Sequence, residues 1–110
     1  MKATITSIEL KVPLKFFLLS AKALNIIKQL KATNCKDFKK KGIWTKHYTM
    51  TLWNSETELK EFARNGAHLD AMKASSQIAK KIKTVTIDKT ALPTWKEAIT
   101  LLENGKVFNY

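Results

Sequence analysis

The stretch from Thr49 to Met72 constrains the fold more than any other part of the chain. It opens on a run of β-branched and aromatic residues that ends at Trp53, which is typical of a strand. Ser55 and Glu58 then have the spacing of a capping box, in which each side chain binds an end amide of a helix. The sequence therefore predicts a strand that leads directly into a short helix, with Phe62 on its apolar side.

A glycine break follows this short helix. Asn65 and Gly66 provide the left-handed residue that ends a helix. A second helical run is expected from Ala67 to Ile78, because its apolar residues recur at helical spacing. His68 stands at the start of this run.

The rest of the chain alternates between strand and helix patterns. Strands are expected over residues 3–11, 35–41, 43–53 and 83–88, with a short tail strand over 107–110. A long helix is expected over 16–31, and a final helix over 95–102, with Thr94 and Glu97 as its possible capping box. Gly42 is expected to form the turn before the longest strand. The order is that of an α+β, ferredoxin-like βαββαβ fold with an extra C-terminal helix.

The longest predicted strand carries large side chains on both faces. Trp44 and Tyr48 share one face, and His47 and Trp53 share the other. We expect the helices to cover one face of the sheet, so the other face needs a cover of its own. A second copy of the sheet is the simplest cover, which predicts a two-fold homodimer forming a dimeric α/β barrel.

Size and cysteine content limit the class of protein. The 110 residues predict one domain, 1–110, with a single core. Cys35 is the only cysteine, which excludes an intrachain disulfide and indicates a reducing, cytoplasmic compartment. No membrane span is expected. The three glycines, Gly42, Gly66 and Gly105, cannot make either common phosphate-binding loop.

The net charge of +11 raises the question of an anionic partner. Only Lys36 to Lys41 is a dense lysine cluster. Arg64 is the only arginine, although arginine is the usual side chain for reading phosphates and bases. A solvated, lysine-rich surface is therefore the favoured interpretation, and binding of an anion or nucleic acid by the cluster is the weaker alternative.

The Thr51-Leu52-Trp53 strand end, Ser55, the Leu59/Phe62 helix and Gly66-Ala67-His68 with Met72 together resemble the dimeric α/β-barrel superfamily. The residues look most like those of antibiotic-biosynthesis-monooxygenase-like proteins, and within that group like uncharacterised relatives of spheroidene monooxygenase. The superfamily includes cofactor-free monooxygenases, haem-degrading enzymes and proteins with no assigned reaction, so the resemblance implies a fold more firmly than an activity.

The resemblance implies a pocket between sheet and helices that holds an apolar or aromatic small molecule. Its expected lining residues are Trp44, Tyr48, Trp53, Phe62 and Met72. Cofactor-free oxidation in such a pocket lets the bound anion react with oxygen, and this needs a base or an oxyanion partner. His68 and His47 are the candidate catalytic residues.

A structural role competes with each of these assignments. Trp53 and Phe62 are equally suited to core packing. His68 suits a cap or a surface position beside the glycine, and His47 suits a plain strand position. A non-enzymatic, dimeric ligand-binding or stress-related protein is therefore the alternative function.

No cofactor and no metal are predicted. Neither histidine has a carboxylate or a second ligand at a metal-binding spacing. Haem-degrading members of the superfamily have an asparagine in strand one, a tryptophan on the short helix and a histidine further on. Here strand one has no asparagine, and Phe62 and Met72 stand at the other two positions. Haem degradation of that type is not expected, while haem binding by His68 in another way stays open.

Overall fold

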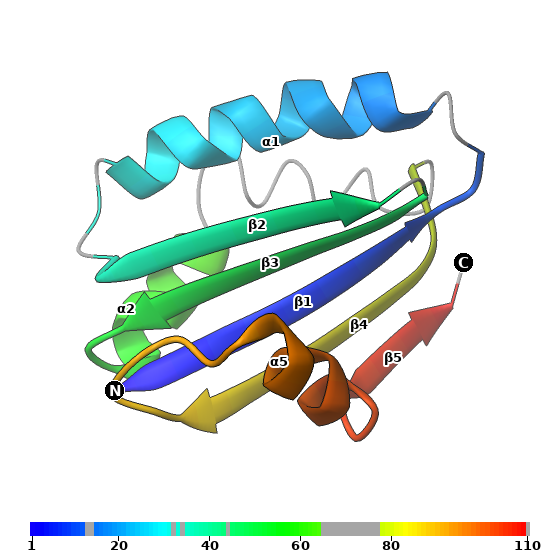
Figure 1. Cartoon of the computed structure of the whole chain (residues 1–110). Helices are drawn as coiled ribbons and strands as arrows, with labels where there is room; N and C mark the ends of the chain where they lie inside the picture. The colour runs from blue at the N-terminus through cyan, green and yellow to red at the C-terminus, as the bar shows by residue number, and fades with distance from the viewer. Residues whose placement is uncertain (13–14, 32, 34, 44, 65–77, 110) are drawn as a thin grey trace.

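The structure is a computed structural model that describes residues 1–12, 15–31, 33, 35–43, 45–64 and 78–109, and its elements are labelled in Figure 1. Within these residues, five strands form one antiparallel sheet: β1 (Lys2–Leu10), β2 (Asp37–Ile43), β3 (Lys46–Trp53), β4 (Ala79–Asp88) and β5 (Lys106–Asn109). The helices are α1 (Phe16–Lys31), α2 (Glu56–Ala63) and α5 (Trp95–Leu102). None of these described helices has the length and apolar character needed to cross a membrane.

The strand order is β2-β3-β1-β4-β5, so β1 lies at the centre between two antiparallel partners. The first four strands in this order, with α1 and α2 between them in sequence, make the ferredoxin-like arrangement. Helix α5 and the short strand β5 follow, and β5 pairs along the outer side of β4 (Figure 1). The predicted α+β, ferredoxin-like fold is therefore confirmed. The homodimer stays a prediction.

The strand register assigns each side chain to one face of the sheet, because successive residues of a strand point to opposite faces. One row across β3, β1 and β4 contains Trp53, Lys2 and Asp88. We call this side the helix face, because Trp53 packs there against Leu30 of α1 and Phe62 of α2. The opposite side is called the second face.

Helix α5 lies on the second face, in front of the sheet in Figure 1. Its buried Ala98 and Leu102 join Ile5 of β1 and Met50 of β3 in a separate core cluster. The prediction that the helices share one face is therefore wrong for the last helix. The physical reason is that one half of the second face is apolar and matches the apolar side of α5.

Several strand boundaries differ from the predicted ones: β2 runs to Ile43 rather than residue 41, β3 begins at Lys46 rather than residue 43, and β4 also begins elsewhere. Gly42, predicted as a turn, lies inside β2 opposite His47. A β-carbon at Gly42 would approach Nδ1 of His47 to 2.6 Å, so the strand needs a residue without a side chain beneath that ring. Strand β4 begins at Ala79 rather than Lys83, because it continues to pair with the end of β1 through a bulge at Glu9.

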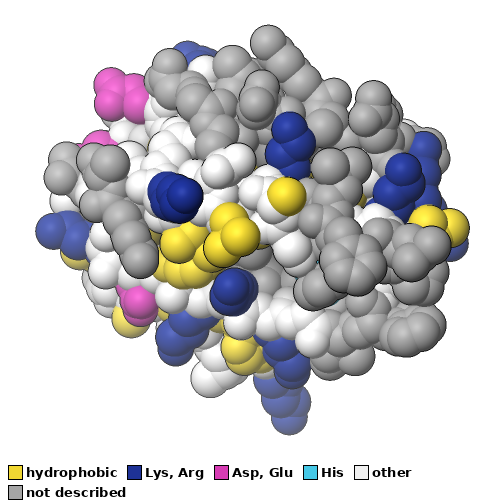
Figure 2. All heavy atoms as spheres, turned by 90° about the horizontal axis from the view of Figure 1, so that it is seen from above, with side chains coloured by type: hydrophobic (Ala, Val, Ile, Leu, Met, Phe, Trp, Pro, Cys, Tyr) yellow, Lys and Arg dark blue, Asp and Glu magenta, His cyan; other side chains and the backbone are white. Residues whose placement is uncertain are grey.

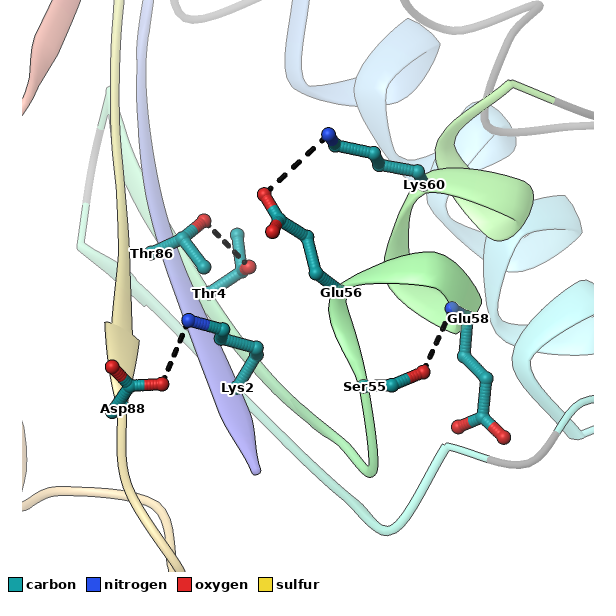
Figure 3. Close-up of polar contacts among 8 residues, drawn as sticks. All are labelled: Lys2, Thr4, Ser55, Glu56, Glu58, Lys60, Thr86 and Asp88. Atoms are coloured by element: carbon teal, nitrogen blue, oxygen red, sulfur yellow. Dashed lines mark hydrogen bonds and ion pairs between the residues drawn. The ribbon is translucent and has the colours of Figure 1, made fainter.

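The N-cap half of each predicted capping box is confirmed, while no return hydrogen bond from a Glu side chain is seen among the described residues. The Ser55 hydroxyl accepts a hydrogen bond from the Glu58 backbone N–H at 3.3 Å (Figure 3). The Thr94 hydroxyl accepts one from the Glu97 N–H at 3.2 Å. Each cap contributes about 1 kcal/mol to helix stability. The helix predicted from residue 67 onward lies outside the described residues, apart from the buried Ile78.

Candidate functional site

Threonines occupy the middle of the helix face. In the register they form two rows across β3, β1 and β4: Thr51, Thr4 and Thr86 in one, and Thr49, Thr6 and Thr84 in the other. We call this group the threonine floor. With strands about 4.8 Å apart and side chains of one face about 7 Å apart along a strand, it covers roughly 10 Å by 7 Å.

Hydroxyl groups of the threonine floor form hydrogen bonds with one another, and the Thr51 hydroxyl also accepts one from the indole of Trp53. The Thr4 and Thr86 hydroxyls lie 3.0 Å apart, and those of Thr6 and Thr84 lie 3.3 Å apart. All six residues keep some solvent exposure, and Thr86 is the most exposed of them. A hydroxyl that donates one hydrogen bond can still accept others. The floor is therefore a partly open, hydroxyl-rich surface below helices, where an apolar surface is more usual.

Charged side chains stand beside the first row of the floor (Figure 3). Lys2 binds Asp88 across the strands at 2.7 Å, and Lys60 binds Glu56 along α2 at 3.5 Å. The hydrogen bond from the Lys2 ammonium lowers the pKa of the Asp88 carboxyl, and the same bond raises the pKa of Lys2. This side of the floor thus carries two solvent-exposed ion pairs.

Aromatic side chains close the same end of the floor. Trp53 and Phe62, which were predicted to line the ligand pocket, lie in contact with their ring centroids 5.1 Å apart. Only 1% of Trp53 and 6% of Phe62 is exposed, so they form a core wall that offers little ring surface. The indole N–H of Trp53 donates to the Thr51 hydroxyl at 2.9 Å, which fixes the wall to the floor.

His47 lies at the other end of the same face. It is half-buried with its Nε2 atom away from solvent, and its neighbours in the register are Gly42 and Ile8. Trp53 is six positions further along β3, which corresponds to about 20 Å. A small molecule cannot contact both side chains. His47 is instead one row from Thr49 and Thr6, roughly 7 Å along the sheet.

Tyr48 points to the second face, where its ring meets Trp95 of α5 in an edge-on contact with centroids 6.4 Å apart. It therefore does not share a pocket with Trp53, Phe62 or His47. The other predicted site residues, Trp44, His68 and Met72, lie outside the described residues.

The threonine floor itself was not predicted. Its signal is present in the sequence, because threonines alternate with apolar residues in three separate strands. Their common face becomes visible only once β3, β1 and β4 are placed side by side.

Cys35 is half-buried beside the aromatic wall. Burial raises the pKa of its thiol, which donates to the backbone carbonyls of Asp37 and Leu52 at 3.2 Å and 3.6 Å. A raised pKa reduces the thiolate fraction, so this group is poorly suited to nucleophilic chemistry. Among the described residues, no three His, Cys, Asp or Glu side chains gather closely enough to hold a metal ion.

Solved structures share this fold. The chain is similar to Rv0793 from Mycobacterium tuberculosis, with a TM-score of 0.73 and 12% identity over 84% of this chain and 98% of that protein. It is similar to a conserved protein from Methanosarcina mazei, with a TM-score of 0.72 and 14% identity over 81% and 92%. A protein described as an antibiotic biosynthesis monooxygenase gives a TM-score of 0.70 and 12% identity over 84% and 100%.

No protein-family model matches the sequence, and no curated protein matches it. The chain thus has the fold of antibiotic-biosynthesis-monooxygenase-like proteins, as the resemblance in its sequence implies. At these identities the likeness establishes the architecture, and any reaction must be argued from the side chains.

Proposed function

We propose that the chain is a monooxygenase-like protein that binds a small aromatic molecule with phenolic oxygens on the threonine floor. The observation that carries this proposal is the double row of hydroxyls below α1 and α2. The fold shared with an antibiotic biosynthesis monooxygenase supports it.

The second row of the floor is the better position for the ligand oxygens. Among the described residues, no hydrogen bond involves the hydroxyl of Thr49, and its neighbour Thr6 is half-buried. These two hydroxyls can donate to a phenolate oxygen, and a hydrogen bond to a charged group is stronger than one between neutral groups. This row also lies next to His47.

His47 is the candidate base. An imidazole is the side chain best suited to take up a proton near neutral pH. Removal of a phenolic proton would leave an electron-rich anion that oxygen can attack, and the threonine hydroxyls would hold that anion. One oxygen atom would enter the ligand, and the other would leave as water with two hydrogens from the substrate.

The test uses 1,4-naphthohydroquinone as a model ligand, with binding measured without oxygen by calorimetry. Replacing Thr6 and Thr49 by valine keeps their shape and removes two hydroxyls. We expect binding to weaken about tenfold, since each hydrogen bond contributes about 0.5–1.5 kcal/mol. Thr100→Val, on exposed α5, is the matched control and should bind as the parent does.

Oxygen uptake then separates catalysis from binding alone. A His47→Gln variant should bind the quinol and lose its oxygen uptake. Equal uptake in parent and variant would exclude His47 as the base. Equal binding by the parent and the Thr6→Val/Thr49→Val variant would refute the threonine floor as the ligand site.

A further inference from the structure

The second row of the threonine floor continues across all five strands of the sheet. Outside Thr49, Thr6 and Thr84, the register places Lys40 of β2 at one end of this row and Lys106 of β5 at the other. Four strand spacings separate the two lysines, or about 19 Å. Both are exposed, and neither forms an ion pair with any of the described residues. The proposed ligand site therefore has a positive charge at each end.

Apolar side chains form the neighbouring row of the helix face. This row runs from His47 through Ile8 and Ile82 to Phe108 of β5. The two isoleucines are half-buried, and 38% of Phe108 is exposed. A flat aromatic ring can lie along this row while its oxygen reaches the threonine hydroxyls, since ligand sites usually combine apolar surface with a few polar groups.

The ammonium group of Lys106 lies beside this apolar row. Its Nζ atom is 5.1 Å from the centre of the Phe108 ring, which is the distance of a cation–π contact. Lys106 and Phe108 are two positions apart on β5, so both side chains stand on the helix face. The phenylalanine ring thus keeps the positive charge at the edge of the proposed site.

Within the described strands, these two rows contain no carboxylate. Asp88 stands on the same face about 13 Å from Thr84 along β4, and it already binds Lys2. A charge without an opposite charge nearby attracts an anion more strongly than one that is already paired. Lys106 is therefore suited to bind a negatively charged group of the ligand.

We propose that the ligand of the threonine floor is a phenol that also carries a negatively charged group, such as a carboxylate, and that Lys106 binds this group. The inference rests on the proposed function, because it names the substrate class of the same site. Thr6 and Lys106 are two strand spacings apart, about 10 Å, which a two-ring ligand and the lysine side chain together can bridge. The homodimer predicted from the sequence would use the second face, so it does not compete with this ligand.

Positive charge is common elsewhere on the molecule. The view from above α1 shows Lys and Arg side chains around a hydrophobic area, with few acidic ones (Figure 2). A test must therefore separate Lys106 from the general attraction of a chain with a net charge of +11. Lys40 provides the matched control, because it has the same charge, is also exposed and ends the same row.

The experiment compares two ligands by calorimetry without oxygen: 1,4-dihydroxy-2-naphthoate, and 1,4-naphthohydroquinone, which lacks the carboxylate. The parent should bind the naphthoate about tenfold more tightly, because a hydrogen bond between charged groups is stronger than one between neutral groups. In Lys106→Gln the two ligands should bind alike, with the affinity for the quinol unchanged. Lys106→Arg and Lys40→Gln should both keep the preference. Thermal unfolding shows that each variant is folded before binding is compared.

The outcomes distinguish this inference from the proposed function. Normal binding of the quinol without a preference for the naphthoate would overturn the inference and leave the proposed function intact. Failure of the parent to bind either ligand would overturn both. A preference that survives in Lys106→Gln, or falls equally in Lys40→Gln, would mean that general charge attracts the carboxylate. A preference lost only in Lys40→Gln would place the anion at the β2 end of the row, and the assignment to Lys106 would be wrong.

Discussion

Gly42 lies directly beneath the imidazole of His47, so replacing it by alanine tests the packing of the candidate base. The added β-carbon would come within 2.6 Å of Nδ1 and 2.9 Å of Cε1 of His47. Both atoms belong to a rigid ring, so the whole side chain must move. Overpacking of this kind costs about 1–3 kcal/mol.

A second effect of the same substitution has the opposite sign. Alanine restricts the unfolded chain more than glycine does, which stabilises the folded state by about 0.4–1 kcal/mol. We therefore expect Gly42→Ala to lower the free energy of unfolding by roughly 1–2 kcal/mol in total. For a domain of this size, that corresponds to a fall in Tm of about 5–15 °C.

The assay is a double-mutant cycle with His47→Ala, using urea unfolding followed by tryptophan fluorescence. Without the imidazole the clash is gone, so Gly42→Ala should be neutral or slightly stabilising in that background. The coupling energy between the two positions should be about 1–3 kcal/mol. A coupling below about 0.5 kcal/mol would refute the placement of His47 over Gly42.

Three further predictions concern other parts of the structure. Phe62→Ala should lower the free energy of unfolding by about 3–5 kcal/mol and red-shift the fluorescence of Trp53, and an unshifted spectrum would argue against their contact. Asp88→Asn should lower Tm slightly near neutral pH. Because Lys2 lowers the pKa of the Asp88 carboxyl in the folded state, this contribution is lost as the pH falls through that lowered pKa, and the Tm values of the two proteins should converge in acid. Burial raises the pKa of Cys35, so iodoacetamide should alkylate it more slowly in the folded protein than in urea at about pH 8, and equal rates would contradict this.

Local sequence signals were enough to predict the ends of those helices whose ends depend on their own residues. The bounds of α1 follow from apolar spacing, and the start of α5 follows from the Thr94 cap. Positions set by tertiary contacts were missed. Gly42 suggests a turn by its type, but its place is fixed by the His47 ring across the strand. The side of the sheet that α5 covers depends on how the chain leaves β4, which no local pattern reports.

The candidate site was predictable only in part. Trp53 and Phe62, both expected at the pocket from the resemblance, lie in contact because the Ser55 cap leads the chain directly from β3 into α2. The grouping of Tyr48 with them ignored alternation along β3, which sends neighbouring side chains to opposite faces. The threonine floor combines three distant strands, so it requires the topology.

Strand β2 forms one border of the sheet, and its outer backbone groups have no partner strand among the described residues. Such a border can pair with the same border of another molecule and start aggregation. Charged side chains at Lys39 and Lys41 oppose this pairing, because two such strands side by side would bring their ammonium groups together. The two lysines therefore protect the chain from edge-to-edge pairing at β2, and removing them should lower its solubility even where the fold is intact.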